Sequence, residues 1–152
     1  MTISRQEGLL PALEQEPTIT VSIPAAFQYL NVVGEAIRAL LERAVEADRK
    51  DEFVNSVELA VHETCTNIVK HAYDSDGGRI VVALTLADNP RRVVADTYDT
   101  GRSFDLLDVQ EPDLDAVQER GYGLFLIQNL VDDVSYHAND DGNRWRLVKR
   151  ID

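Results

Sequence analysis

A helical apolar period surrounds Glu63-Thr64-Cys65-Thr66-Asn67-Ile68-Val69-Lys70-His71. Glu63, Asn67 and His71 recur every four residues, so they project from one face of the predicted helix. Small and apolar side chains have the spacing of a buried stripe on a different face: Val57, Val61, Thr64, Ile68 and Ala72. The segment predicts a helix that buries one face and presents a carboxylate, a carboxamide and an imidazole on a second. An ordinary solvated face is the alternative interpretation of these three polar residues.

Length and composition indicate one globular domain. The chain has 152 residues, of which 44% are hydrophobic and 28% charged. This length allows a hydrophobic core without disulfides or metals to support it. The net charge of -12 argues against general nucleic-acid binding, which needs a basic surface. It also means that a polyphosphate ligand would need a divalent cation or a local group of donors.

The single cysteine, Cys65, cannot form an internal disulfide and is predicted to be a small buried side chain. This usage fits a reducing compartment. The first residues have no basic start with an apolar segment like that of a signal peptide, and no run has the length of a membrane span. We therefore expect a cytoplasmic protein.

Hydrophobic periodicity and turn signals predict strands at 18–23, 79–87, 92–98, 134–137 and 144–151. They predict helices at 25–47, 51–72 and 123–132, with Asp51 as the N-cap of the second helix. Residues 1–17 are expected to be a flexible tail and 18–152 one domain. The polar, acidic connection at 100–120 is long enough to be a functional lid. Short turns favour antiparallel pairing, so the predicted fold class is α+β, a two-layer sandwich with a mixed, mostly antiparallel sheet covered by helices.

Asp99-Thr100-Gly101 comes at the end of a predicted strand. A carboxylate in this place can accept a hydrogen bond from an exocyclic amine such as that of adenine. Gly101 would let a flat base approach the backbone closely. An ordinary turn is the alternative interpretation.

Gly121-Tyr122-Gly123 opens the last predicted helix, and Arg120 adds a positive charge beside it. The unpaired amide groups and the dipole at a helix start favour an anion. A flexible hinge is the alternative. The longer glycine pattern of a dinucleotide site and the Gly-Lys-Ser/Thr of a Walker motif do not occur in the sequence.

The polar face of the first segment has the groups that phosphoryl transfer needs. Glu63 can accept a proton from an attacking hydroxyl. Asn67 can give an amide oxygen to Mg²⁺, which takes few protein ligands and keeps waters and phosphate oxygens. His71 or Lys70 could reach the phosphates, and positioning with charge neutralisation is most of what this chemistry requires.

Together and in this order, the three segments resemble the GHKL ATP-binding superfamily. Within it, the chain is most similar to the bacterial anti-sigma factor serine kinases of the stress-response type, also called switch-protein kinases. The likeness extends over residues 18–150 and is carried by an N-box, a G1 box and a G2 box. These are Glu63-Thr64-Cys65-Thr66-Asn67 through Lys70-His71-Ala72-Tyr73, Asp99-Thr100-Gly101-Arg102-Ser103-Phe104-Asp105, and Glu119-Arg120-Gly121-Tyr122-Gly123-Leu124-Phe125-Leu126-Ile127.

The resemblance implies the GHKL/histidine-kinase-like ATP-binding fold, with ATP and Mg²⁺ as cofactors. It makes Glu63 the general base and Asn67 the magnesium ligand. Further nucleotide-binding positions that it implies are His71, Asp99, Gly101, Arg120, Gly121, Gly123 and Leu124. It implies a sigma factor as a sequestered partner and a STAS-domain anti-anti-sigma factor as the serine substrate. A homodimer through the first strand and helix is expected by analogy.

The chain departs from the family pattern in two places. The family often has a threonine in the last strand that contributes to the adenine pocket, and the corresponding place here holds Asn143 or Arg144. The lid is also short beside some members. Neither departure affects Glu63 or Asn67.

Three functions are compatible with this sequence. The first is a protein-serine kinase that also sequesters a sigma factor. The second is a non-catalytic module in which ATP sets the affinity for a protein partner. The third is a detached histidine-kinase catalytic domain, which normally needs a helical hairpin with a phospho-acceptor histidine. The chain has only His62, His71 and His137, two in the N-box helix and one in a late strand.

Overall fold

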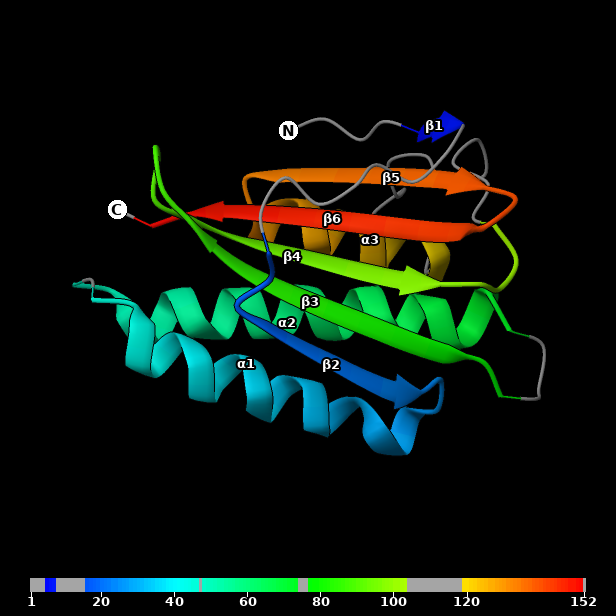
Figure 1. The fold of residues 1–152 in the computed structure, drawn as a ribbon, viewed down its shortest axis with the longest axis horizontal. Coiled ribbons are helices and arrows are strands. Elements are labelled where there is room, and N and C mark those ends of the chain that lie inside the picture. The colour runs from blue at the N-terminus through cyan, green and yellow to red at the C-terminus, as the bar shows by residue number, and fades with distance from the viewer. Residues whose placement is uncertain (1–4, 8–15, 47, 74–76, 104–118, 152) are drawn as a thin grey trace.

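The computed structural model (Figure 1) describes residues 5–7, 16–46, 48–73, 77–103 and 119–151. It has two layers, a twisted sheet and a layer of three α-helices that all lie on one face of the sheet (Figure 1). The two-layer α+β sandwich predicted from the sequence is confirmed.

The sheet has six strands in the order β1-β5-β6-β4-β3-β2. Neighbouring strands are antiparallel except β1, which pairs parallel with β5. The strands are β1 (Arg5–Glu7), β2 (Ile19–Pro24), β3 (Arg79–Ala87), β4 (Arg92–Asp99), β5 (Asp133–Asn139) and β6 (Gly142–Arg150). Strand β1 lies within the segment predicted as a flexible tail. A strand of three residues is too short to show the alternation of apolar and polar residues from which strands are predicted. The prediction of a mixed, mostly antiparallel sheet is confirmed.

The helices differ from the predicted ones mainly at their starts. They are α1 (Leu30–Ala44), α2 (Lys50–His71) and α3 (Glu119–Leu130), preceded by a 3₁₀ turn, η1 (Phe27–Tyr29). The predicted first helix starts too early, because the backbone of Ala25 still bonds to the carbonyl of Gly78 next to the sheet. Asp51 is not the N-cap of α2, because Arg49 occupies that position. Asp51 lies in the first turn, where its carboxylate interacts favourably with the positive end of the helix dipole.

Helix α3 begins at Glu119, so Gly121 and Gly123 lie inside its first turns. The helix predicted at 123–132 therefore starts too late, because α3 already begins at Glu119. The apolar run that begins at Leu124 gave the predicted start, because polar residues of a first helical turn carry no hydrophobic period.

The hydrophobic core fills the space between the sheet and the helices. Its members include Ile37 and Leu41 of α1, Val61 of α2, and Leu84 of β3, all completely buried. Cys65 is 1% exposed within this core, as predicted. Burial raises the pKa of its thiol to about 12, so the side chain stays neutral.

The two central strands β4 and β6 bring distant residues together at one edge of the core. They are antiparallel, and the register places Asp99, the last residue of β4, opposite Asn143 near the start of β6. The turn before β6 is held by Asn139, whose Oδ1 accepts hydrogen bonds from the backbone of Asp141 and Gly142. Gly142 has φ 149°, and a Cβ there would lie 2.8 Å from the carbonyl oxygen of Asp99, so this position favours glycine.

Candidate functional site

Asp99 is a buried carboxylate, 5% exposed, and the hydrogen bonds that it accepts go to one of its two oxygens. Its Oδ1 accepts hydrogen bonds from Asn143 Nδ2 at 2.9 Å and from the backbone nitrogen of Gly101 at 3.0 Å. Within the described part of the chain, Oδ2 has no hydrogen-bond donor. Burial raises the pKa of Asp99 above the ordinary value of 3.8, and the two hydrogen bonds oppose part of this rise. The carboxyl group is thus a buried acceptor with one oxygen available.

Asn143 holds this carboxylate and the chain that follows it. Its Nδ2 donates to Asp99 Oδ1 and also to the carbonyl oxygen of Gly101 at 3.0 Å. Its Oδ1 accepts from Ser103 Oγ at 2.8 Å. From the sequence, Asn143 stands out only as a departure from the family pattern. The predicted turn fixes where β6 begins, and an antiparallel pairing of β6 with β4 would have placed Asn143 beside Asp99.

The backbone after Asp99 passes very close to the end of α2. A Cβ at Gly101 would lie 2.3 Å from the carbonyl oxygen of Ala72, and that carbonyl accepts a hydrogen bond from the nitrogen of Arg102 at 2.6 Å. Tyr73 Oη accepts from the nitrogen of Thr100 at 2.9 Å. This contact with α2 requires glycine at position 101, whichever ligand approaches.

Asn67 lies at the contact between α2 and α3 rather than on a solvated face. It is 7% exposed, and a Cβ at Gly123 would come within 3.1 Å of its Oδ1 and 3.2 Å of its Nδ2. Glu63 and His71, on the same side of α2, are half-buried. The interpretation of this face as an ordinary solvated one is wrong for Asn67. The absence of a side chain on Gly123 allows the amide to lie between the two helices.

The remaining predicted positions lie on α3 or in the predicted lid. Leu124 is 4% exposed and belongs to the hydrophobic core, so packing accounts for its burial. Arg120 and Gly121 lie in the first turn of α3. Most of the predicted lid, residues 104–118, lies outside the described residues.

Four parts of the chain therefore meet at one end of the helix layer. The end of β4 touches the end of α2 through Gly101, and the start of β6 holds Asp99. Asp99 also interacts electrostatically with Cys65, which lies two positions before Asn67 on α2. Helix α3 approaches the same part of α2 through Gly123. The site combines a carboxylate acceptor, an amide oxygen and the first turns of a helix.

These residues fit a magnesium–nucleotide complex better than a metal held by protein alone. Within the described ranges, no three His, Cys, Asp or Glu side chains are grouped as metal ligands. Asn67 supplies an amide oxygen at a helix contact. Mg²⁺ commonly binds through one or two protein groups together with waters and phosphate oxygens.

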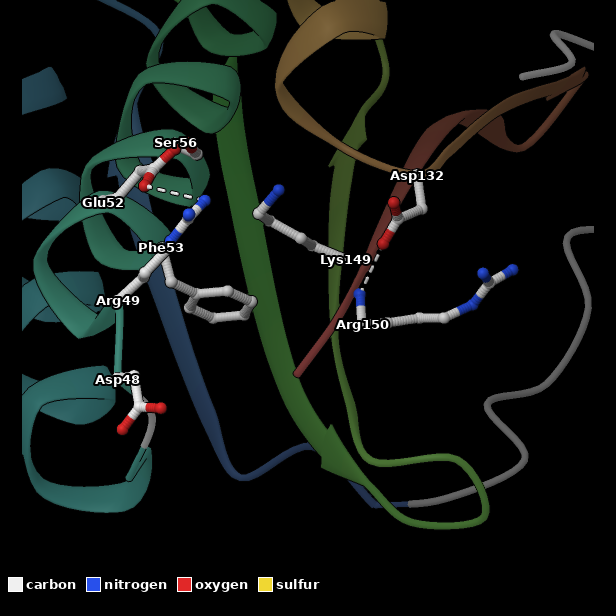
Figure 2. Close-up of a pocket in the computed structure, with 8 residues that line it drawn as sticks. All are labelled: Asp48, Arg49, Glu52, Phe53, Ser56, Asp132, Lys149 and Arg150. Carbon is white, nitrogen blue, oxygen red and sulfur yellow. Dashed lines mark hydrogen bonds and ion pairs between the residues drawn. The ribbon is translucent and has the colours of Figure 1, made fainter. Parts of the chain in front are cut away.

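A separate hollow of about 520 Å³ lies at the other end of the helix layer (Figure 2). It contains none of the predicted site residues and is lined by Asp48, Arg49, Glu52, Phe53, Ser56, Asp132, Lys149 and Arg150. Lys149 Nζ donates to the carbonyl oxygen of Leu130 at 3.0 Å and lies 5.8 Å from the centre of the Phe53 ring. Acidic and basic side chains are both present, so the hollow shows no preference for an anion. The nucleotide motifs are at the C-terminal half of α2 and the start of β6, whereas this hollow is at the opposite ends of both.

Among the helices that the structure describes, none has both the length and the apolar character to cross a membrane.

Relatives of known name share nearly the whole chain. Proteins named serine-protein kinase RsbW from Bacillus thuringiensis (strain Al Hakam) and Bacillus cereus (strain AH820) are 29% identical over 148 residues. Each alignment covers 91% of this chain and 88% of the relative.

A solved histidine kinase domain, from the blue-light activated histidine kinase EL346 of Erythrobacter litoralis, has a similar fold. The TM-score is 0.55 at 19% sequence identity, and the match covers 85% of this chain and 66% of that one. This likeness supports the fold alone. The family model described as histidine kinase-like ATPase domain matches residues 23–149. The chain belongs to the histidine kinase-like ATPase domain family.

Proposed function

We propose that this protein is an ATP-dependent protein-serine kinase. The observation that carries the proposal is the meeting of Asp99, Asn67 and the first turns of α3 at one end of the helix layer. Family membership supports ATP as the nucleotide, and the relatives named serine-protein kinase support serine as the acceptor.

Each end of the nucleotide would meet a different part of the site. Asp99 Oδ2 is the acceptor for the exocyclic amine of adenine. Asn67 would hold Mg²⁺ through its amide oxygen, and the first turns of α3, which contain Gly121 and Gly123, would lie beside the phosphates. Arg120 and His71 add positive or donor groups for the same phosphates. When bound, Mg²⁺ neutralises charge on the transferred phosphoryl group.

Glu63 is the residue with the proton-accepting role, one helical turn before Asn67 on α2. Its carboxylate accepts the proton of the substrate serine hydroxyl. The serine oxygen forms a bond to the γ-phosphorus while the bond from that phosphorus to the bridging oxygen of ADP breaks. The products are phosphoserine and ADP.

The partners that we propose follow from the resemblance to anti-sigma factor serine kinases. The protein sequesters a sigma factor and phosphorylates a STAS-domain anti-anti-sigma factor, as a cytoplasmic homodimer. Regulation of transcription in a stress response is the corresponding physiological proposal.

The decisive experiment is incubation of the protein with γ-labelled ATP, Mg²⁺ and the STAS protein that it binds. Glu63→Ala and Glu63→Gln are expected to abolish phosphoserine formation while ATP binding, measured by calorimetry, remains. Glu52→Ala is the matched control, because Glu52 is an exposed carboxylate in the first turn of the same helix. Transfer by Glu63→Ala at the normal rate would remove Glu63 as the base. ATP binding without any phosphoserine in the native protein would favour the non-catalytic, ATP-gated module instead.

A further inference from the structure

Asn143 uses its amide to join three parts of the candidate nucleotide site. It contacts the Asp99 carboxylate, the Gly101 carbonyl and the Ser103 hydroxyl, and it is 1% exposed. We propose that Asn143 is the positioning residue that sets base selectivity, by occupying Asp99 Oδ1 and leaving Oδ2 as a pure acceptor for an exocyclic amine. This inference rests on the proposed function, because it takes the site to bind a nucleotide.

The two oxygens of Asp99 are unequal. Oδ1 receives two donors, Asn143 Nδ2 at 2.9 Å and the Gly101 nitrogen at 3.0 Å, which match its two lone pairs. Oδ2 receives none from the described residues. With the purine ring in the same orientation, adenine presents its C6 amine to Oδ2, whereas guanine presents its C6 carbonyl oxygen and would put two acceptors against each other. An unpaired buried acceptor is costly, so this arrangement favours adenine over guanine.

The orientation of the Asn143 amide is fixed by its own partners. Its nitrogen faces two acceptors, Asp99 Oδ1 and the carbonyl oxygen of Gly101. Its oxygen faces the hydroxyl of Ser103 at 2.8 Å. A flipped amide would oppose oxygen to oxygen at two of these contacts. The Asn143 amide and Asp99 Oδ1 are both hydrogen-bonded in this buried network, so Asp99 is held in one rotamer before a base arrives.

The same hydrogen bond favours the ionised form of Asp99. Burial raises the pKa of Asp99, and the Asn143 bond is the larger of the two contacts that lower it again. Cys65 on α2 interacts electrostatically with Asp99 and stays neutral, because burial raises its pKa to about 12. Without the Asn143 donor, Asp99 takes up a proton at a higher pH. A protonated carboxyl group can donate to the carbonyl of guanine, so the loss of Asn143 reduces discrimination in a second way.

Asn143→Thr and Asn143→Val form a matched pair, since the two new side chains have nearly the same shape and only threonine keeps a donor. Calorimetry with ATP and with GTP, each with Mg²⁺, gives the ratio of the two affinities. We expect Asn143→Val to lower ATP affinity by about tenfold to a hundredfold, as for the loss of a hydrogen bond to a charged group. The affinity for GTP should fall less than the affinity for ATP, so the ratio of ATP affinity to GTP affinity drops. Asn143→Thr should keep most of the ATP-to-GTP affinity ratio. Asn129→Val is the control and should leave that ratio unchanged, because Asn129 is exposed and its amide donates to the carbonyl oxygen of Phe125.

A pH series separates positioning from a general effect on stability. The pH at which ATP binding is half lost should be higher in Asn143→Val than in Asn143→Thr. Thermal denaturation establishes that each variant is folded. Ser103→Ala is the substitute variant if Asn143→Val does not fold. Ser103 is exposed, and its hydroxyl donates to Asn143 Oδ1, so the alanine variant loses this hydrogen bond. It should lower the ATP-to-GTP affinity ratio by a smaller factor.

The failures of the two proposals are distinguishable. Equal ATP-to-GTP ratios in the native protein, the valine variant and Ser103→Ala, with ATP binding intact, would overturn the role of Asn143. No binding of ATP by the native protein would overturn the proposed function itself.

Discussion

Asn143 Nδ2 lies 2.9 Å from Asp99 Oδ1, although the two residues are 44 positions apart in the chain. The antiparallel register of β4 and β6 makes this contact, because it aligns the last residue of one strand with the second residue of the other. The contact is buried and joins the core of the sheet to the candidate site. The sheet therefore fixes the backbone of both residues at the candidate site.

Asp99→Asn should weaken ATP binding strongly while the fold persists. The new amide has nearly the same shape but can present a donor where the exocyclic amine of adenine needs an acceptor. We expect a loss of at least about tenfold, corresponding to one hydrogen bond to a charged group. Calorimetry with Mg²⁺ measures the affinity, and Asp141→Asn in the exposed turn before β6 is the control. Equal affinities in Asp99→Asn and the native protein would show that Asp99 does not contact the base.

ATP affinity should fall as the pH is lowered, and the fall should begin above the ordinary aspartate range. Binding needs the Asp99 carboxylate, and the pKa of this group is raised above 3.8 by burial. The ionised form is therefore lost as pH falls through the raised pKa, and affinity is complete only above it. Calorimetry over a pH series tests this prediction. Asp99→Asn should lack this step, and an identical step in that variant would assign the titration to another group or to ATP.

Gly123→Ala should impair magnesium-dependent ATP binding without a large loss of stability. The added Cβ would lie 3.1 Å from Asn67 Oδ1, so the amide must shift by a few tenths of an ångström. Alanine also favours the helix by about 0.5–1 kcal/mol over glycine, which offsets part of the crowding. We expect lower ATP affinity with Mg²⁺ and a smaller change with EDTA present.

Gly34→Ala is the matched control for Gly123→Ala. Its Cβ would meet Glu58 Oε1 at 3.0 Å in the contact between α1 and α2, away from Asn67. Thermal denaturation should show similar small changes for the two variants, and only Gly123→Ala should change the affinity for Mg²⁺-ATP. Equal affinities in both variants would argue against Asn67 as the magnesium ligand.

The predicted strands were close to the observed ones because alternation and turn residues carry most of the strand signal. Strand β3 was predicted with its observed bounds, and Asp99 lies at the predicted strand end. The start of α3 could not be predicted from period alone, since the polar residues of its first turn have no apolar stripe.

The candidate site was only partly predictable. The spacing of Asn67 on α2 indicated a second polar face, but its burial against Gly123 depends on how α3 packs. The role of Asn143 depends on strand register, which pairs residues far apart in sequence. Gly101 illustrates the same limit, because the contact that requires glycine is with the end of another element, at Ala72.

Asp96→Asn should destabilise the protein without removing the nucleotide site. Asp96 is completely buried and accepts hydrogen bonds from Arg146 Nε at 2.8 Å and Nη2 at 3.2 Å. Arg144 is 2% exposed beside them, and within the described residues its Nε and Nη1 have no hydrogen-bond partner. Burial and the neighbouring Arg146 lower the pKa of Arg144, whereas Asp96 raises it.

Removing this carboxylate takes away the anion that pairs with the half-buried Arg146 and that favours the charged form of the buried Arg144. We expect a loss of about 3–5 kcal/mol in the free energy of unfolding, the usual result of breaking a buried ion pair from one side. Urea denaturation measures this loss, and Asp88→Asn at an exposed position is the control. Asp96 precedes Asp99 on β4 but points to the opposite face of the sheet, so ATP affinity of the folded variant should be retained. A variant as stable as the native protein would mean that the two arginines find another anion on this face.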